Sequence, residues 1–115
     1  MLSESRFQLI VVVVETGRAS AIMEAARAAG AEGGTILHGR GVGIHEHSKF
    51  FGIPIEPEKE ILMILIEKTH TEVVLEAVVM AGELNEPGKG IAFVLDVSEV
   101  EGIVHMGTIV SSFRE

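Results

Sequence analysis

Apolar and polar positions follow a pattern that occurs twice along the chain. Each half has an uninterrupted apolar run, then apolar residues at helical spacing, then a second strand segment that follows a glycine-containing turn. The predicted elements are strands at about 7–14, 35–40, 61–66 and 91–97, a helix between Gly17 and Gly30, and a helix at about 73–81. The order β-α-β-β-α-β predicts a ferredoxin-like α+β fold, with both helices on one face of an antiparallel sheet.

Both predicted helices are amphipathic. The inward positions are Ala19, Ile22, Met23 and Ala26 in the first helix and Val74, Ala77, Val78 and Ala81 in the second. Gly30 predicts the C-terminal end of the first helix. Thr69 and Glu72 have the spacing of a capping box, so we expect the second helix to start after this tetrapeptide.

The first and third strands are apolar at every position over 9–14 and 61–66. Such runs indicate burial on both faces of a sheet. Two helices cover one face and the chain has no further layer for the other, so the simplest cover is a second copy of the subunit. These residues alone therefore predict a homo-oligomer.

A long connection at about 41–57 separates the two halves. Its glycines and prolines exclude a long regular element, and connections of this length in compact domains are usually functional or disordered. The tail at about 98–115 is ambiguous, with one candidate short strand at 101–105. We expect all 115 residues, 1–115, to form a single domain.

The composition narrows the classes of function. A net charge of −8 argues against a nucleic-acid surface and against direct binding to anionic lipid heads. The absence of cysteine excludes disulfides and thiolate metal sites. The apolar run at 9–14 is too short to span a bilayer, and the N-terminus lacks signal-peptide features. We expect a cytoplasmic protein without membrane insertion.

Two glycine segments are the main candidates for ligand binding. Residues 38–43, HGRGVG, end the second strand, and residues 88–90, GKG, precede the last one. Glycines let a backbone approach a ligand and present its N–H groups, and Lys89 adds a cation that suits phosphate. Neither segment is a dinucleotide motif or a P-loop, so a flexible turn is the alternative for each. Their matching places in the two halves favour a shared cleft, with one segment from each of two neighbouring subunits.

Two pairs of residues in the long connection each have a functional and a structural interpretation. His45 and His47 could chelate a metal with a nearby carboxylate, or could be solvated loop histidines, which we favour. Phe50 and Phe51 either anchor a partner or fold back on the core.

Catalytic groups are difficult to assemble from this sequence. Glu56, Glu58 and Glu60 could serve as acid–base groups, but a charged strand edge that discourages aggregation is the favoured interpretation. No Ser–His–Asp or Cys–His set can be formed. We do not expect an enzyme.

Three stretches resemble P-II nitrogen regulatory proteins. Residues 30–41, GAEGGTILHGRG, are similar to the second strand of that family and the beginning of the following loop. Residues 57–66 are similar to its third strand, and residues 88–97, GKGIAFVLDV, to its Gly-Asp-Gly-Lys-Ile-Phe loop and last strand. The similarity covers about residues 6–104 in the same element order, so the chain is identified as a divergent member of this family.

The resemblance implies a homotrimer with an adenine nucleotide (ADP, AMP or ATP) bound in the clefts between subunits. The loop at about 41–57 would dock onto a target protein, for which a membrane transporter is one candidate, and the nucleotide would select the loop conformation. The residues that the resemblance assigns to the nucleotide site are Thr35, Gly39, Arg40, Gly41, Ile64, Gly88, Lys89 and Gly90. The residues that we assign to the partner loop are His45, Lys49, Phe50 and Phe51.

Several cations of the family are replaced in this chain. The positions concerned are Ile91 in the glycine loop, Glu58 before the third strand, and Gly102 and Val104 in the C-terminal segment. Their loss predicts weaker triphosphate binding, with Arg40 and Lys89 as partial compensation. A glutamine that helps to hold Mg-ATP and 2-oxoglutarate in the family is Gly43 here, and the chain has no tyrosine that could be uridylylated.

Three functions follow as hypotheses. The first is a regulator that senses a small effector and controls a partner through the 41–57 loop, with a nitrogen role implied by kinship. The alternative is a metal-binding ferredoxin-like trimer of the copper-tolerance type, which depends on His45 and His47. The third is a small cofactor-free oxygenase, which needs a polar pocket inside the subunit.

Overall fold

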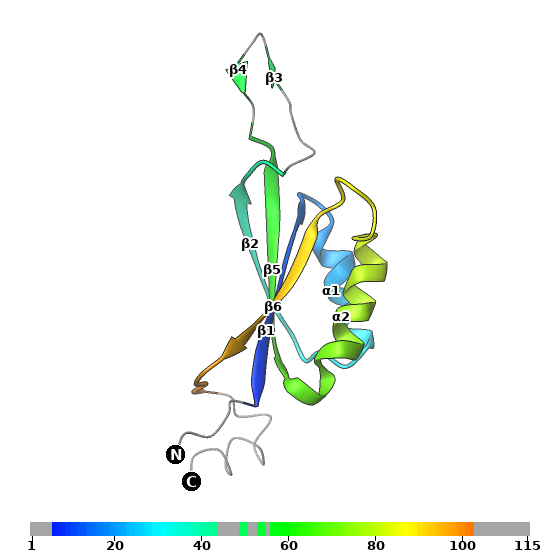
Figure 1. Ribbon diagram of the computed structural model, residues 1–115, viewed down its shortest axis with the longest axis vertical. Coiled ribbons are helices and arrows are strands. Elements are labelled where there is room, and N and C mark those ends of the chain that lie inside the picture. Colours follow the sequence, from blue (N-terminus) through cyan, green and yellow to red (C-terminus); the bar gives the residue numbers. More distant parts are fainter. Residues whose placement is uncertain (1–5, 44–48, 51–52, 55, 103–115) are drawn as a thin grey trace.

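The computed structural model describes residues 6–43, 49–50, 53–54 and 56–102. Four strands form an antiparallel sheet in the order β2-β5-β1-β6, with both helices on one face (Figure 1). The elements in chain order are β1 (Phe7–Glu15), α1 (Ala19–Ala28), β2 (Thr35–Arg40), β3 (Lys49–Phe50), β4 (Ile53–Pro54), β5 (Glu58–Glu67), α2 (Lys68–Gly82) and β6 (Ile91–Val97). This arrangement confirms the ferredoxin-like α+β fold that the apolar pattern predicts.

The predicted positions of the sheet strands and of the first helix agree closely with the structure. β2 and β6 have the predicted limits, and β1 continues by one residue, to Glu15. β5 starts at Glu58 rather than near Ile61, because its charged first residues still pair in the ladders with β1 and β2. The inward face of α1 is also as predicted. Its buried residues are Ala19, Ile22 and Ala26, with Met23 packed against the core.

The predicted capping box at the start of α2 is wrong. The helix begins at Lys68, directly after β5, and no side chain caps it. The chain turns at Glu67, which has an extended conformation (φ −68°, ψ 140°). The Lys68 N–H donates to the carbonyl of Arg6 at 2.8 Å, and the Thr71 hydroxyl donates to the Glu67 carbonyl. A neighbouring segment thus satisfies the helix start, and Thr69 lies inside the first turn.

The inner stripe of α2 ends differently from the prediction. Ala81 is exposed, whereas Gly82 is buried one turn beyond Val78. A Cβ at Gly82 would lie 3.0 Å from Leu84 Cδ2 and 3.2 Å from Ile22 Cδ1, so α1 packs closely there. Glu83 then takes a left-handed conformation (φ 54°) and ends the helix.

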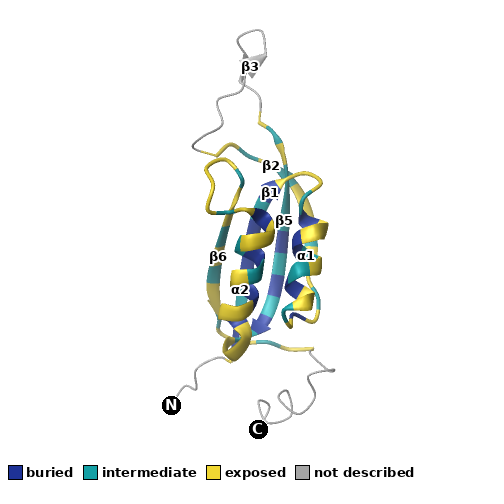
Figure 2. Cartoon of the chain, turned by 90° about the vertical axis from the view of Figure 1, so that its right-hand side faces the viewer, coloured by how far each residue is buried: buried dark blue, intermediate teal, exposed yellow. Residues whose placement is uncertain are grey.

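The hydrophobic core lies between the sheet and the two helices. Figure 2 shows α1 and α2 in front of the sheet with their buried residues turned toward it. The largest contributions from the sheet come from alternate positions of β1 and β5, which the ladder pairs in register. These core positions are Ile10, Val12, Val14, Leu62, Ile64 and Ile66.

Shortening a core side chain should have a measurable cost. We expect Ile64→Val to lower the free energy of unfolding by about 1 kcal/mol, because Ile64 is fully buried and a small cavity would remain. Val73→Ala, on the exposed side of α2, is the control and should change stability by less than about 0.5 kcal/mol. Urea unfolding measures both, and equal effects would contradict this description of the core.

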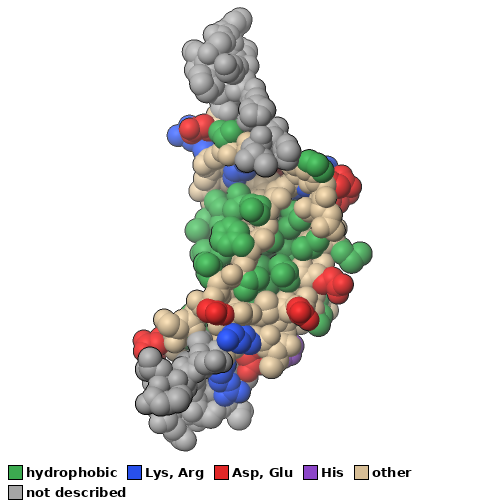
Figure 3. Space-filling model, in the orientation of Figure 1, with side chains coloured by type: hydrophobic (Ala, Val, Ile, Leu, Met, Phe, Trp, Pro, Cys, Tyr) green, Lys and Arg blue, Asp and Glu red, His purple; other side chains and the backbone are tan. Residues whose placement is uncertain are grey.

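The other face of the sheet is apolar and uncovered. Figure 3 shows hydrophobic side chains gathered over the middle of the molecule. The ladders align them in three rows: Leu37, Ile61, Val13 and Ile91; then Met63, Val11 and Phe93; then Leu65, Leu9 and Leu95. Leu37, Ile91, Phe93 and Leu95 are between 42% and 56% exposed. We call these ten residues the open face. Together with the core on the opposite face, they account for the unbroken apolar runs at 9–14 and 61–66.

The 41–57 connection contains one short regular feature in its described part. β3 and β4 form a two-stranded antiparallel ladder, which Figure 1 shows beyond the end of the main sheet. The base of the connection is closed by a hydrogen bond from the Gly41 N–H to the Pro57 carbonyl at 3.1 Å. Residues 98–102 have no regular structure, and most of the candidate strand at 101–105 lies outside the described residues. Across the described ranges, no helix is both long enough and apolar enough to cross a membrane.

Candidate functional site

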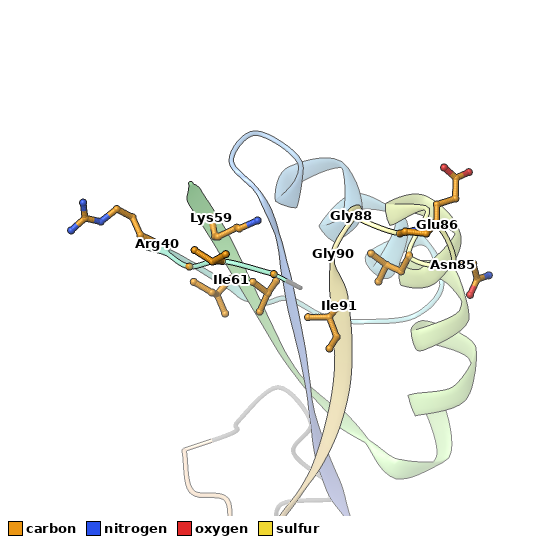
Figure 4. Close-up of a pocket in the computed structure, with 14 residues that line it drawn as sticks. Arg40, Lys59, Ile61, Asn85, Glu86, Gly88, Gly90 and Ile91 are labelled. Atoms are coloured by element: carbon orange, nitrogen blue, oxygen red, sulfur yellow. The ribbon is translucent and has the colours of Figure 1, made fainter. Parts of the chain in front are cut away.

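A pocket of about 760 Å³ lies at the end of the sheet from which the 41–57 connection leaves (Figure 4). β1 and β2 end at this side, and β5 and β6 begin there, so four chain segments meet. The lining residues are Val13, Arg40, Gly41, Val42, Gly43, Lys59, Ile61, Leu84, Asn85, Glu86, Pro87, Gly88, Gly90 and Ile91. We call this site the glycine pocket.

The two glycine segments that stand out in the sequence line the same pocket. Residues 40–43 form one side, and residues 84–88 together with Gly90 form another. Both segments come from one chain, because β2 ends, and β6 begins, at the same end of the same sheet. The expected cleft shared by two neighbouring subunits stays a prediction.

Four of the residues assigned to a nucleotide site line the pocket. These are Arg40, Gly41, Gly88 and Gly90. Lys89, between the two glycines, is not among the lining residues, and its ammonium lies 3.4 Å from a carboxylate oxygen of Glu83. The 88–90 segment therefore lines the pocket with its two glycines and not with the lysine between them.

The other three assigned residues lie elsewhere. Ile64 is fully buried in the core between the sheet and the helices. Thr35 pairs with Met63 at the start of β2 and is exposed, and Gly39 pairs with Lys59. Whether these residues contact a ligand stays a prediction of the resemblance.

The structure adds one cation, Lys59, that was not assigned to the site from the sequence. Lys59 lines the pocket, whereas Glu58, which takes the place of a family lysine, does not. In Figure 4, the Lys59 side chain extends from β5 toward the loop that contains Gly88, while Arg40 points away. Strand alternation was the available signal, because Lys59 shares its side of β5 with Ile61, another lining residue.

Gly90 has a conformation and surroundings that only glycine fits. Its φ is +139°, and an added Cβ would lie 2.6 Å from the Val13 carbonyl oxygen and 2.8 Å from Val14 Cγ1. The backbone of the 84–90 segment thus lies directly against the end of β1. By contrast, Gly41 and Gly88 have no atom within 4 Å of an added Cβ. Gly88 nevertheless has a positive φ of 81°.

One of the acidic residues has a structural contact. A carboxylate oxygen of Glu60 accepts a hydrogen bond from the Ala19 N–H, at 2.9 Å, and so satisfies the N-terminus of α1. This contact accounts for Glu60 without a catalytic role.

The metal and partner candidates of the long connection cannot be placed. His45, His47 and Phe51 lie outside the described residues, and of Lys49 and Phe50 the structure describes only the backbone ladder. Within the described ranges, no group of three His, Cys, Asp or Glu side chains could hold a metal ion.

The fold and the pocket define a small ferredoxin-like protein with a ligand-sized cavity beside a long connection. A family model described as nitrogen regulatory protein P-II matches residues 7–105, and the chain therefore belongs to the P-II family. Among solved structures, a crystal structure of Arabidopsis thaliana PII bound to citrate matches with a TM-score of 0.68. The identity is 25%, over 90% of this chain and 85% of that chain. No curated protein matches significantly. P-II proteins are regulatory signal-transduction proteins, not enzymes.

Proposed function

We propose that this protein is a P-II-type regulator that binds a small anionic effector in the glycine pocket and controls a partner protein through the 41–57 connection. The observation that carries the proposal is the position of Gly41, Val42 and Gly43. They line the pocket and are also the first residues of the connection. The Gly41 N–H also donates a hydrogen bond to the Pro57 carbonyl. A ligand that contacts Gly41 would therefore act on both ends of the connection.

An adenine nucleotide, as ADP, AMP or ATP, is the ligand class that we propose. The apolar lining side chains, among them Val13, Ile61 and Ile91, suit the face of a base. The glycine backbones and Lys59 suit an anion. With Ile91 in place of a family lysine, few cations surround the pocket, which favours a di- or monophosphate over a triphosphate. Since the similar Arabidopsis protein is bound to citrate, citrate is the second anion to test.

We propose a homotrimer, in which the open face is covered by neighbouring subunits. An exposed apolar surface of this extent is typical of an interface. Val13, Ile61 and Ile91 belong both to the first row of the open face and to the pocket lining. Covering the open face would therefore place the pocket at a subunit boundary, where a neighbour adds to its walls.

The regulation that we propose is a shift of conformational population. An effector that binds better to one arrangement of the 41–57 connection increases the fraction of molecules in that arrangement. The partner protein then recognises this arrangement. Its identity, a role in nitrogen regulation and a cytoplasmic location follow from kinship and remain part of the proposal.

Calorimetric titration of nucleotide-stripped protein tests the ligand. We expect saturable binding of ADP, AMP, ATP or citrate, with and without Mg²⁺, and no response to 2-oxoglutarate. Lys59→Ala should weaken binding about tenfold, because a charge-assisted contact to the anion is lost. Lys68→Ala is the matched control. Lys68 lies within 4.0 Å of Asp96 at the opposite end of the sheet and should not affect binding.

The outcomes separate the parts of the proposal. Binding that Lys59→Ala leaves unchanged would place the ligand outside the glycine pocket. If none of the anions binds, the effector mechanism fails, although the chain remains a P-II protein by fold and sequence.

A further inference from the structure

Arg18 stands at the start of α1, where its side chain makes no capping hydrogen bond. It is the N-cap residue of α1, where Ser, Thr, Asp or Asn would normally accept a hydrogen bond from the helix. Its side chain makes no such bond. A residue that departs from the local rule for its position often serves a contact elsewhere in the fold.

The Arg18 guanidinium instead reaches the loop that forms one wall of the glycine pocket. One terminal nitrogen donates to the Lys89 carbonyl at 2.6 Å, and the other donates to the Gly82 carbonyl at 2.7 Å. These carbonyls flank the loop, because Gly82 is the last residue of α2 and Lys89 directly precedes Gly90. A single planar group thus fixes the distance between the ends of the loop.

The backbone at Arg18 is itself held in place by hydrogen bonds. The Arg18 N–H donates to the Glu15 carbonyl at 3.2 Å, which fixes the turn between β1 and α1. The adjacent Ala19 N–H is bonded to Glu60, the neighbour in sequence of the pocket residue Lys59. The start of α1 therefore connects the β5 side of the pocket with the 83–89 side.

We propose that Arg18 is a positioning residue, which holds the 83–89 loop in its pocket-forming arrangement before a ligand arrives. The inference rests on the proposed function for its meaning in ligand binding. Arg18 does not line the pocket, so its effect on a ligand passes through the loop. The loop has hydrogen bonds of its own, such as Lys89 N–H to the Glu86 carbonyl at 3.3 Å, but these do not attach it to α1.

Amide hydrogen exchange on the whole protein tests this inference without a ligand. We expect Arg18→Ala to accelerate exchange in the 83–90 peptide about tenfold, while the β1 and β5 peptides keep their protection. Arg18→Lys should give an intermediate result, because one ammonium cannot reproduce the planar two-nitrogen contact. Val78→Ala, a core change, is the control for a general loss of stability and should not accelerate this loop selectively.

Titration with ADP and citrate then separates positioning from general stability. Arg18→Ala should weaken binding of the probe about tenfold, and Val78→Ala should leave binding unchanged. Unchanged exchange in the 83–90 peptide, or equal effects of Arg18→Ala and Val78→Ala on it, would overturn the inference. If neither probe binds the unsubstituted protein, the proposed function fails, and the exchange result still decides the role of Arg18.

Discussion

Phe93→Glu is expected to convert the proposed trimer into single chains of 12.3 kDa. Phe93 lies on β6 in the middle row of the open face, beside Val11 and Met63. A carboxylate there would have to be buried unpaired in an interface, which costs several kcal/mol. Light scattering on dilute protein measures the mass, and circular dichroism verifies that the chain stays folded. Loss of assembly should also weaken effector binding, since the pocket would lose its neighbour.

Met80→Glu is the matched control for this experiment. Met80 is 74% exposed on α2, away from the open face, so the same change of charge should leave the assembly intact. A protein that is already monomeric without any substitution would contradict the proposed trimer. Dissociation by Met80→Glu but not by Phe93→Glu would assign the interface to the helices.

Gly90→Ala is expected to lower the free energy of unfolding by about 3 kcal/mol. The positive φ disfavours any side chain, and the added Cβ would overlap the Val13 carbonyl and Val14 Cγ1. The end of β1 belongs to the centre of the sheet, so it cannot easily move aside. Urea unfolding measures the change.

Gly41→Ala is the matched control, because Gly41 lines the same pocket but has open space around its Cα. Its effect on stability should stay below about 0.5 kcal/mol. Equal losses from both substitutions would mean that the close packing at Gly90 does not determine stability.

Much of the fold follows from local patterns. An unbroken apolar run located β1, and segments that follow glycine turns located β2 and β6. The spacing from Ala19 to Ala26 located α1, because burial on one side imposes the helical period. The ends of α2 were not predictable from spacing. Its start is satisfied by the carbonyl of Arg6 and its last turn packs on Ile22, and both contacts come from distant parts of the chain.

The residues of the candidate site that could be predicted were three loop glycines and Arg40. Gly41, Gly88 and Gly90 stand out because of their type, and the topology then brings them together. Lys59 and Arg18 carry no motif. Their roles depend on which side of a strand a residue occupies, and on a contact between residues 71 positions apart. Such information arises only when the sheet is assembled.

The direct junction of β5 and α2 makes the segment from Glu58 to Gly82 one continuous arm that folds back at Glu67. One end of this arm carries Lys59 and Ile61, and the other leads into the loop with Gly88, so its two ends face each other across the glycine pocket. The separation of these two ends is therefore set by how α2 packs on the sheet from the turn at Glu67 onward. That turn lies at the opposite end of the sheet, where the Lys68 N–H donates to the Arg6 carbonyl. Residues far from the pocket thus take part in setting its width.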